Sequence, residues 1–204
     1  MPELILIRAN GCGLCQMKAA LLWRQGYTID RNTNAQCWPL DVVSVDIIKS
    51  VPIRNQQENC LINEWNMSKL CTCNLPQVLR LHPAENHQYI FGNNSECLTA
   101  QEMQRNNFQH SLMIVRADDF ILYRCKVLNQ QNQYQEKSKA NFVYNGQYYE
   151  HISVTDPEYF SAPNGINLGS VYIVVSMPCT SIYVSSFQSK CYYKFIAKIF
   201  PACL

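Results

Sequence analysis

The chain has 204 residues, of which 48% are hydrophobic and 16% are charged, so it is long enough for one large or two small domains with a packed core. Its 17 Lys and Arg residues against 15 Asp and Glu residues give a net charge of +2. This balance excludes the strongly basic class of nucleic-acid binders, and any contact with a polyanion must therefore come from a local patch.

The sequence carries neither a membrane span nor a recognisable export signal. No apolar run reaches the roughly 18 residues that a membrane span needs, and Glu3 and Arg8 interrupt the apolar run at the N-terminus. The 11 cysteines are odd in number and scattered, and several lie in strand-like runs where a reduced thiol is a small hydrophobic side chain. We expect a cytoplasmic protein whose cysteines are reduced and mostly structural.

The first predicted elements are a strand over residues 3–9 and a helix over residues 16–25, with Cys12 and Cys15 between them. Strand, C-x-x-C and helix is the opening of a thioredoxin-like fold, in which the helix N-terminus lowers the pKa of a reactive thiol. The proline usual between the two cysteines is absent, and no cis-proline βαβ pattern follows. An inert loop is the preferred interpretation, and a thiol-disulfide redox protein and metal binding by the pair are the alternatives.

Strands are expected on both sides of a helical connection. Residues 39–53 alternate in hydrophobicity and predict a strand, whereas residues 60–65 fit either a strand or a helical turn. The mixed pattern of residues 66–105 predicts a helical connection rather than a sheet. It contains a short helix capped at Asn74 and a second short helix that begins at a capping box over residues 99–102.

Two more strands are predicted over residues 111–117 and 120–128, joined at Asp118-Asp119. In the second strand, Ile121 and Tyr123 alternate with Leu122 and Arg124, which indicates one buried and one wet face. We expect the Ile121 face to be the buried one.

Asn145-Gly146 is the strongest turn signal in the chain, because both residues tolerate the positive φ of a two-residue hairpin turn. It predicts a hairpin of residues 140–144 with residues 147–154, in which Phe142 pairs with Tyr149 and Ala140 with His151. Phe142, Tyr144 and Tyr149 then share an aromatic face. Imperfect alternation on the other face indicates a bulge or a crossover between sheets.

The remaining chain is predicted to hold a capped turn and two strands. Asp156 is the expected N-cap of a helical turn that starts at Pro157. Residues 170–176 are apolar enough for a buried strand, and residues 190–200 alternate cleanly. The inward set predicted for this last strand is Cys191, Tyr193, Phe195, Ala197 and Ile199, and the outward set is Lys190, Tyr192, Lys194, Ile196 and Lys198.

No catalytic or metal-binding pattern is present. Cys71, Cys73, His82 and His87 lack zinc-ligand spacing, because C-x-C is too close and no second pair follows at the expected distance. The sequence has no Ser-His-Asp order, paired carboxylates or Gly-rich phosphate loop, and its four histidines are scattered. We expect a non-catalytic protein without a metal or cofactor.

Several of these segments resemble the prokaryotic dual OB-containing domain, a family of stand-alone proteins and parts of larger proteins, some in apparent conflict or defence contexts. The resembling segments cover residues 39–62, 110–120 and 139–160, and more loosely 169–179 and 191–200. The resemblance implies a mainly β chain with two small OB-like barrels and a few short helices. The first subdomain would span residues 1–110 and the second barrel residues 111–204.

OB-folds bind single strands by stacking bases on exposed aromatic side chains, beside Lys or Arg contacts to phosphate. We therefore expect a module that binds single-stranded nucleic acid, and a protein-interaction or scaffold subunit is the alternative. A purely structural interpretation of the same residues is that the aromatic side chains fill barrel interiors and the lysines form an ordinary solvated face. The candidate nucleic-acid-binding residues are Lys190, Tyr192, Lys194, Lys198, Arg124, Lys126, Tyr144 and Tyr149.

Overall fold

The computed structural model divides the chain into two compact units, residues 1–83 and residues 84–204, each of which is described by itself. The residues that the structure describes are 2–9, 17–23, 40–52, 56–57, 60–106, 108, 110–128, 133–178, 181–184 and 189–202. Within these ranges, no helix has both the length and the apolar character that crossing a membrane would require.

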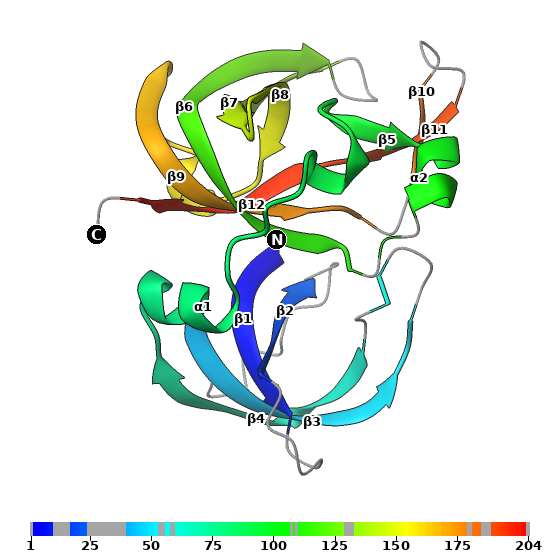
Figure 1. Cartoon of the computed structure of the whole chain (residues 1–204), viewed down its shortest axis with the longest axis vertical. Coiled ribbons are helices and arrows are strands. Elements are labelled where there is room, and N and C mark those ends of the chain that lie inside the picture. The colour runs from blue at the N-terminus through cyan, green and yellow to red at the C-terminus, as the bar shows by residue number, and fades with distance from the viewer. Residues whose placement is uncertain are drawn as a thin grey trace. The chain divides into compact units, whose positions relative to one another are not determined.

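The first unit is a four-stranded sheet followed by one helix (Figure 1). The strand order is β2-β1-β3-β4, in which β1 and β3 are parallel and the two outer pairs are antiparallel. The elements are β1 Pro2–Ala9, β2 Met17–Trp23, β3 Asp41–Ser50, β4 Cys60–Thr72 and α1 Leu75–Leu81.

Three expectations for this unit are confirmed and two are wrong. The strands at residues 3–9 and 39–53 are present, and α1 begins at a capping box in which Asn74 Oδ1 accepts from Gln77 N at 2.9 Å. The helix expected over residues 16–25 is instead β2, because pairing along β1 overrides the helix propensity of its Ala and Leu residues. Residues 66–72 likewise continue β4 rather than a helical connection.

Five strands of the second unit close a barrel in the order β6-β7-β8-β12-β9, with β9 also pairing with β6. Neighbours are antiparallel except β8 and β12, which are parallel. Numbered within the barrel, the order is 1-2-3-5-4-1, which is the connectivity of an OB-fold. The strands are β6 Leu112–Leu128, β7 Tyr134–Tyr144, β8 Gln147–Val154, β9 Ile166–Ser176 and β12 Phe195–Pro201.

The barrel interior is built around stacked aromatic rings. Phe142 stacks between Phe120 and Tyr149, with ring centroids 5.7 and 5.1 Å away, and Tyr144 meets Tyr149 edge to face. All four side chains are buried, and aliphatic residues of β6, β8, β9 and β12 surround them. The hairpin's aromatic face, predicted from alternation, is therefore the core of the barrel.

Strand β6 is one bent strand rather than the two that we predicted. Its pairing with β7 and β9 shifts near Asp118 and Phe120, and Asp119 has φ +51°, so a bulge replaces the predicted join. The bulge also reverses the predicted faces, because Leu122 points into the core whereas Ile121 is exposed. A bend of this kind lets one long strand pair on both sides of a small barrel.

The β7–β8 hairpin turns at Asn145-Gly146, as predicted, and pairs Phe142 with Tyr149. Farther from the turn the register shifts, so Ala140 pairs with Ile152 and not with His151. This is the bulge that the broken alternation indicated.

A satellite sheet and three short helical segments accompany the barrel in the same unit (Figure 1). The sheet has the order β10-β11-β5, and Ile90 and Leu98 of the preceding segment are buried in the barrel core. The compact units divide at Pro83 and Ala84. The elements are η1 Ile90–Gly92, β5 Cys97–Thr99, α2 Ala100–Asn106, η2 Pro157–Tyr159, β10 Ile182–Val184 and β11 Ser189–Tyr193.

The two caps expected in this unit are confirmed. Thr99 N and Oγ1 both donate to Glu102 Oε2, at 2.7 and 2.8 Å, and Glu102 N donates back to Thr99 Oγ1, which is a capping box at the start of α2. Asp156 caps η2 by accepting from Glu158 N at 3.2 Å. These local signals place the short helical turns correctly.

Candidate functional site

The strand order of the second unit identifies where an OB barrel binds its ligands. OB-folds use the outer face of their second and third strands together with the loops between strands 1 and 2 and between strands 4 and 5. In this barrel those elements are the β7–β8 hairpin, the end of β6 with the start of β7, and the strands β10 and β11. We call these three elements together the binding face.

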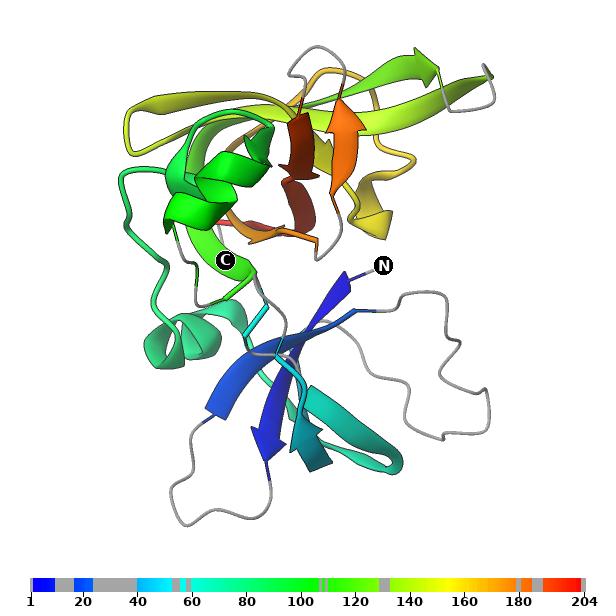
Figure 2. The ribbon, with the colours of Figure 1, turned by 90° about the vertical axis from the view of Figure 1, so that its right-hand side faces the viewer.

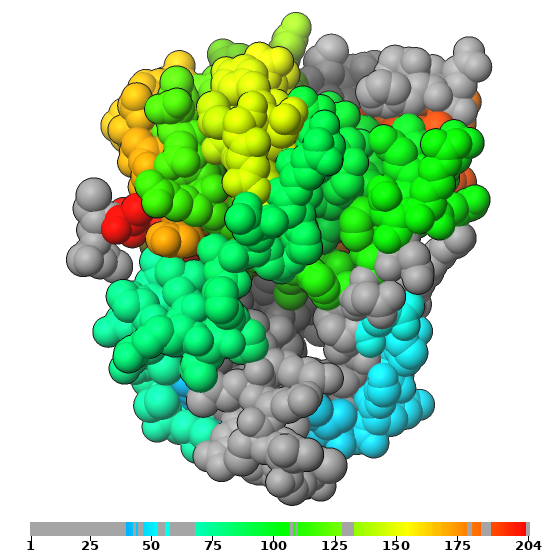
Figure 3. All heavy atoms as spheres, in the orientation of Figure 1, coloured from blue at the N-terminus to red at the C-terminus, as the bar shows by residue number. Residues whose placement is uncertain are grey.

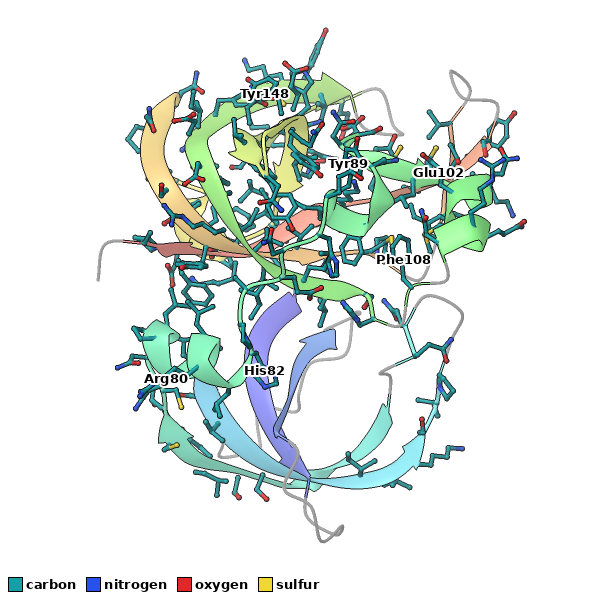
Figure 4. The ribbon with its side chains drawn as sticks, viewed as in Figure 1. Arg80, His82, Tyr89, Glu102, Phe108 and Tyr148 are labelled. Atoms are coloured by element: carbon teal, nitrogen blue, oxygen red, sulfur yellow. The ribbon has the colours of Figure 1, made fainter. Side chains whose placement is uncertain are left out.

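Exposed tyrosines occur on each part of the binding face. Tyr148 on β8 is 50% exposed, Tyr134 at the start of β7 is 75% exposed, and Tyr183 on β10 is 64% exposed. Figure 4 shows Tyr148 on the outer side of the hairpin, and Figure 3 shows that hairpin, in yellow, at the surface of its unit. A tyrosine in such a position can stack on a planar ligand.

Exposed lysines accompany these tyrosines. β6 and β7 extend beyond the barrel as a two-stranded arm (Figure 2), on which Lys126 and Lys137 are exposed. The register places them on opposite faces of the arm, since Lys126 pairs with Glu136 whereas Lys137 pairs with Cys125. On the satellite sheet, exposed Lys190 pairs directly with Tyr183, so a cation and an aromatic ring share one face.

A polar cluster occupies the middle of the outer face. Tyr123 of β6 packs edge to face on His151 of β8, with ring centroids 6.0 Å apart, and the Tyr123 hydroxyl and His151 Nδ1 are hydrogen-bonded. Burial, with smaller contributions from nearby groups including Cys125 and Glu150, raises the pKa of Tyr123 to about 12. Its phenol therefore stays protonated at neutral pH.

Two of the predicted site residues, Tyr144 and Tyr149, lie inside the barrel. Each hydroxyl accepts from a backbone N–H of the preceding segment at 2.8 Å, Tyr144 from His87 and Tyr149 from Ile90. Burial raises the pKa of Tyr149 to about 12. These side chains tie residues 85–93 across the barrel, and they offer no ring face for a ligand.

Lys194 also lies inside rather than on the predicted outer stripe. It is 1% exposed, and its Nζ donates to Asn93 O at 2.6 Å and to Asn93 Oδ1 at 2.7 Å, 5.5 Å from the centre of the Tyr149 ring. Burial lowers the pKa of Lys194 to about 7, although the charges of Glu102 and Cys97 favour the protonated form. The structure therefore joins Tyr149 and Lys194, but as a buried polar contact.

Lys198 is the second exception to the predicted stripe. Its Nζ lies 3.3 Å from Asp156 and 2.7 Å from Glu158, and its side chain is buried. The alternation fails because the strand breaks at Lys194 between β11 and β12, and because the register of β12 shifts between Ile196 and Lys198. Period-two counting from Lys190 therefore assigns the wrong face to Lys194 and Lys198.

Of the four remaining predicted residues, two are held by contacts within the protein and two are exposed to solvent. Tyr192 packs against the barrel core, and Arg124 Nη2 donates to Ala162 O at 2.7 Å, which ties the arm to the loop before β9. Lys126 and Lys190 remain exposed on the binding face.

Tyr134, Tyr148 and Tyr183 were missed by the sequence analysis. Tyr148 had a usable signal, because it alternates with Tyr149 and must therefore face outward when Tyr149 faces inward. Tyr134 and Tyr183 lie next to polar loops, where periodicity gives no orientation. Their assignment to the binding face depends on the strand order of the barrel, which the sequence pattern does not give.

The described part of the chain holds no candidate metal centre. Across the ranges given above, no three His, Cys, Asp or Glu side chains are placed to hold a metal ion. Cys12 and Cys15 lie outside the described residues, but the element after them is strand β2, so the strand, C-x-x-C, helix context of a thioredoxin-like site is absent.

Comparison with protein-family models identifies a family that covers most of the chain. The family model described as the dual OB-containing domain matches residues 24–199. Searches of curated proteins and of solved structures returned no match.

Proposed function

Since the chain belongs to the dual OB-containing domain family and is an OB-type binding module, we propose that its second unit binds single-stranded nucleic acid along the binding face. The observation that carries this proposal is the placement of the exposed tyrosines. Tyr148, Tyr134 and Tyr183 occupy, one each, the three elements on which OB barrels bind ligands. Stacking on such rings contributes about 1–3 kcal/mol per base.

The charges on the binding face support a single strand held by few phosphate contacts. Lys126, Lys137 and Lys190 are exposed on the arm and the satellite sheet, with Lys126 on the opposite side of the arm from Lys137. Glu150 lies on the outer face, and Glu96 beside it forms an ion pair with Lys139 at 3.2 Å. Carboxylates repel phosphate but accept hydrogen bonds from exocyclic amino groups of bases. Bases facing the sheet and phosphates facing the flanking lysines satisfy both requirements, and they need an unpaired strand.

The proposal is tested by fluorescence anisotropy of labelled single-stranded DNA and RNA oligomers with the reduced full chain over a salt series. Three phosphate contacts predict that log K falls with log salt with a slope of about −2, since each contact contributes roughly −0.7 for single strands. Changing Lys126, Lys137 and Lys190 together to Gln should weaken binding and flatten this slope.

A matched control removes three charges elsewhere, with Gln at exposed Lys49, Arg80 and Arg105. This variant has the same net charge as the test variant and should bind almost as the wild type does. Equal losses in the two variants would show that the binding face is not involved. An absence of binding even at low salt would remove the nucleic-acid proposal.

A protein-docking function is a second candidate because of one specific feature. β10 is the edge strand of the satellite sheet, and its Ile182 and Tyr183 are 57% and 64% exposed. An exposed apolar edge can accept an added strand from a partner. Partner binding of this kind would persist at high salt, where phosphate contacts fail.

A further inference from the structure

His151 has a backbone conformation that its residue type rarely adopts. Its φ is +59°, in the left-handed region, and it is an exposed residue in the middle of strand β8. Asn141 Oδ1 accepts from His151 N at 2.9 Å and holds this conformation in place. Strained backbone conformations that neighbouring groups hold in place occur often at functional sites.

The strain belongs to a β-bulge that changes which side chains reach the surface. Phe142 pairs with Tyr149 and Ala140 with Ile152, and all four side chains point into the core. Two residues, Glu150 and His151, therefore oppose the single Asn141. A regular strand would place only one residue between two inward positions. The bulge puts two adjacent polar side chains, both exposed, on the outer face.

Contacts with Tyr123 define the orientation of the His151 imidazole. The hydrogen bond with the Tyr123 hydroxyl engages His151 Nδ1 and leaves Nε2 as the ring nitrogen that can meet a ligand. The ring also packs edge to face on Tyr123, at an interplanar angle of 75°. Nε2 is therefore a positioned polar atom of an exposed side chain on the outer face, beside exposed Glu150 in the sequence.

We propose that His151 and Glu150 together read the edge of a nucleobase, with His151 Nε2–H donating to a ring or carbonyl acceptor and Glu150 accepting from an amino or imino group. This inference rests on the proposed function and adds to it a preference for one base over the others. Tyr148, on the same strand face three residues earlier, supplies a stacking surface, and Tyr123 is the positioning residue that fixes the imidazole. Stacking alone tolerates every base, whereas an oriented donor beside an acceptor does not.

The test compares short single-stranded oligomers that differ only in one central base within an oligothymidine context. The wild-type chain should prefer one central base by about fivefold or more, the factor expected for a single well-placed hydrogen bond. His151→Asn tolerates a positive φ and should preserve the bulge while the preference falls toward one. Tyr123→Phe keeps the aromatic packing, removes the orienting hydroxyl, and should also reduce the preference.

Each outcome has one meaning. His151→Gly accepts the positive φ without strain, and loss of preference in a variant at least as stable as the wild type would support base reading by the imidazole. Wild-type binding without base preference, or variants that retain the preference, would overturn this inference and leave the proposed function standing. If the wild type binds no oligomer at all, the proposed function fails, and base reading fails with it.

Discussion

Replacing Asp156 with Ala should be among the most damaging single changes in the barrel. This carboxylate is completely buried between η2 and β12, where it accepts from Ile199 N at 2.9 Å and from Glu158 N at 3.2 Å. It also faces the buried Lys198 ammonium at 3.3 Å. The substitution removes the acceptor of two backbone N–H groups and one of the two carboxylates that contact the buried Lys198 ammonium.

The size of the effect follows from these two losses. An unpaired buried N–H costs about 1–3 kcal/mol, and breaking a buried ion pair costs about 3–5 kcal/mol. Lys198 keeps a contact of 2.7 Å to Glu158, whose side chain is 68% exposed, so the ion-pair loss is partly offset. We expect Asp156→Ala to lower the free energy of unfolding by about 3 kcal/mol, and the matched Glu158→Ala by less than about 1 kcal/mol.

Urea denaturation of the reduced full chain measures both variants. The three tryptophans, at positions 23, 38 and 65, all belong to the first unit, so far-UV circular dichroism must be followed beside tryptophan emission to see the barrel. With a slope of about 2 kcal/mol per molar urea, the Asp156→Ala midpoint should fall by roughly 1.5 M. Equal midpoint shifts for Asp156→Ala and Glu158→Ala would refute the reasoning, because the buried carboxylate would then be worth no more than the exposed one.

Two further predictions concern the buried polar contacts of the barrel. Tyr149→Phe leaves Ile90 N without its acceptor and should cost about 1–3 kcal/mol in the same assay, whereas Tyr148→Phe, at an exposed hydroxyl, should change stability by less than about 0.5 kcal/mol. Because burial lowers the pKa of Lys194 to about 7, the unfolded chain binds more protons than the folded chain between about pH 7 and 10, and stability rises with pH across that window. Lys194→Met should lose this rise, and a pH dependence unchanged by the substitution would show that Lys194 does not titrate there.

Local signals in the sequence located the turns and caps of this protein. Asn145-Gly146 predicts the hairpin and its first three residue pairs, because positive φ at two successive residues is a local property. The caps at Asn74, Thr99 and Asp156 are local for the same reason, since each side chain bonds a backbone group two or three residues away. The family resemblance added the OB topology that these signals alone do not specify.

Predictions failed where a distant partner decides the outcome. The segment expected to be a helix is β2, since β1 supplies a pairing edge that intrinsic propensity does not register. The lysines of the last strand were wrongly predicted for the same reason. Lys194 is buried where its ammonium group donates to Asn93, and Lys198 is buried where its ammonium group pairs with Asp156, each far away in sequence.

The amino-acid sequence alone specified the β-rich class, the β7–β8 turn, the capped helical turns and which aromatic side chains of the hairpin share a face. The tertiary structure alone decided which lysines are buried, where the strands bulge, and which tyrosines meet solvent. The physical reason is that alternation reports a face only while the strand stays regular. Alternation is interrupted at the bulges near Asp119 and at His151 and at the strand break at Lys194, so the face of the following residues changes. These irregularities arise from closing five strands into one barrel.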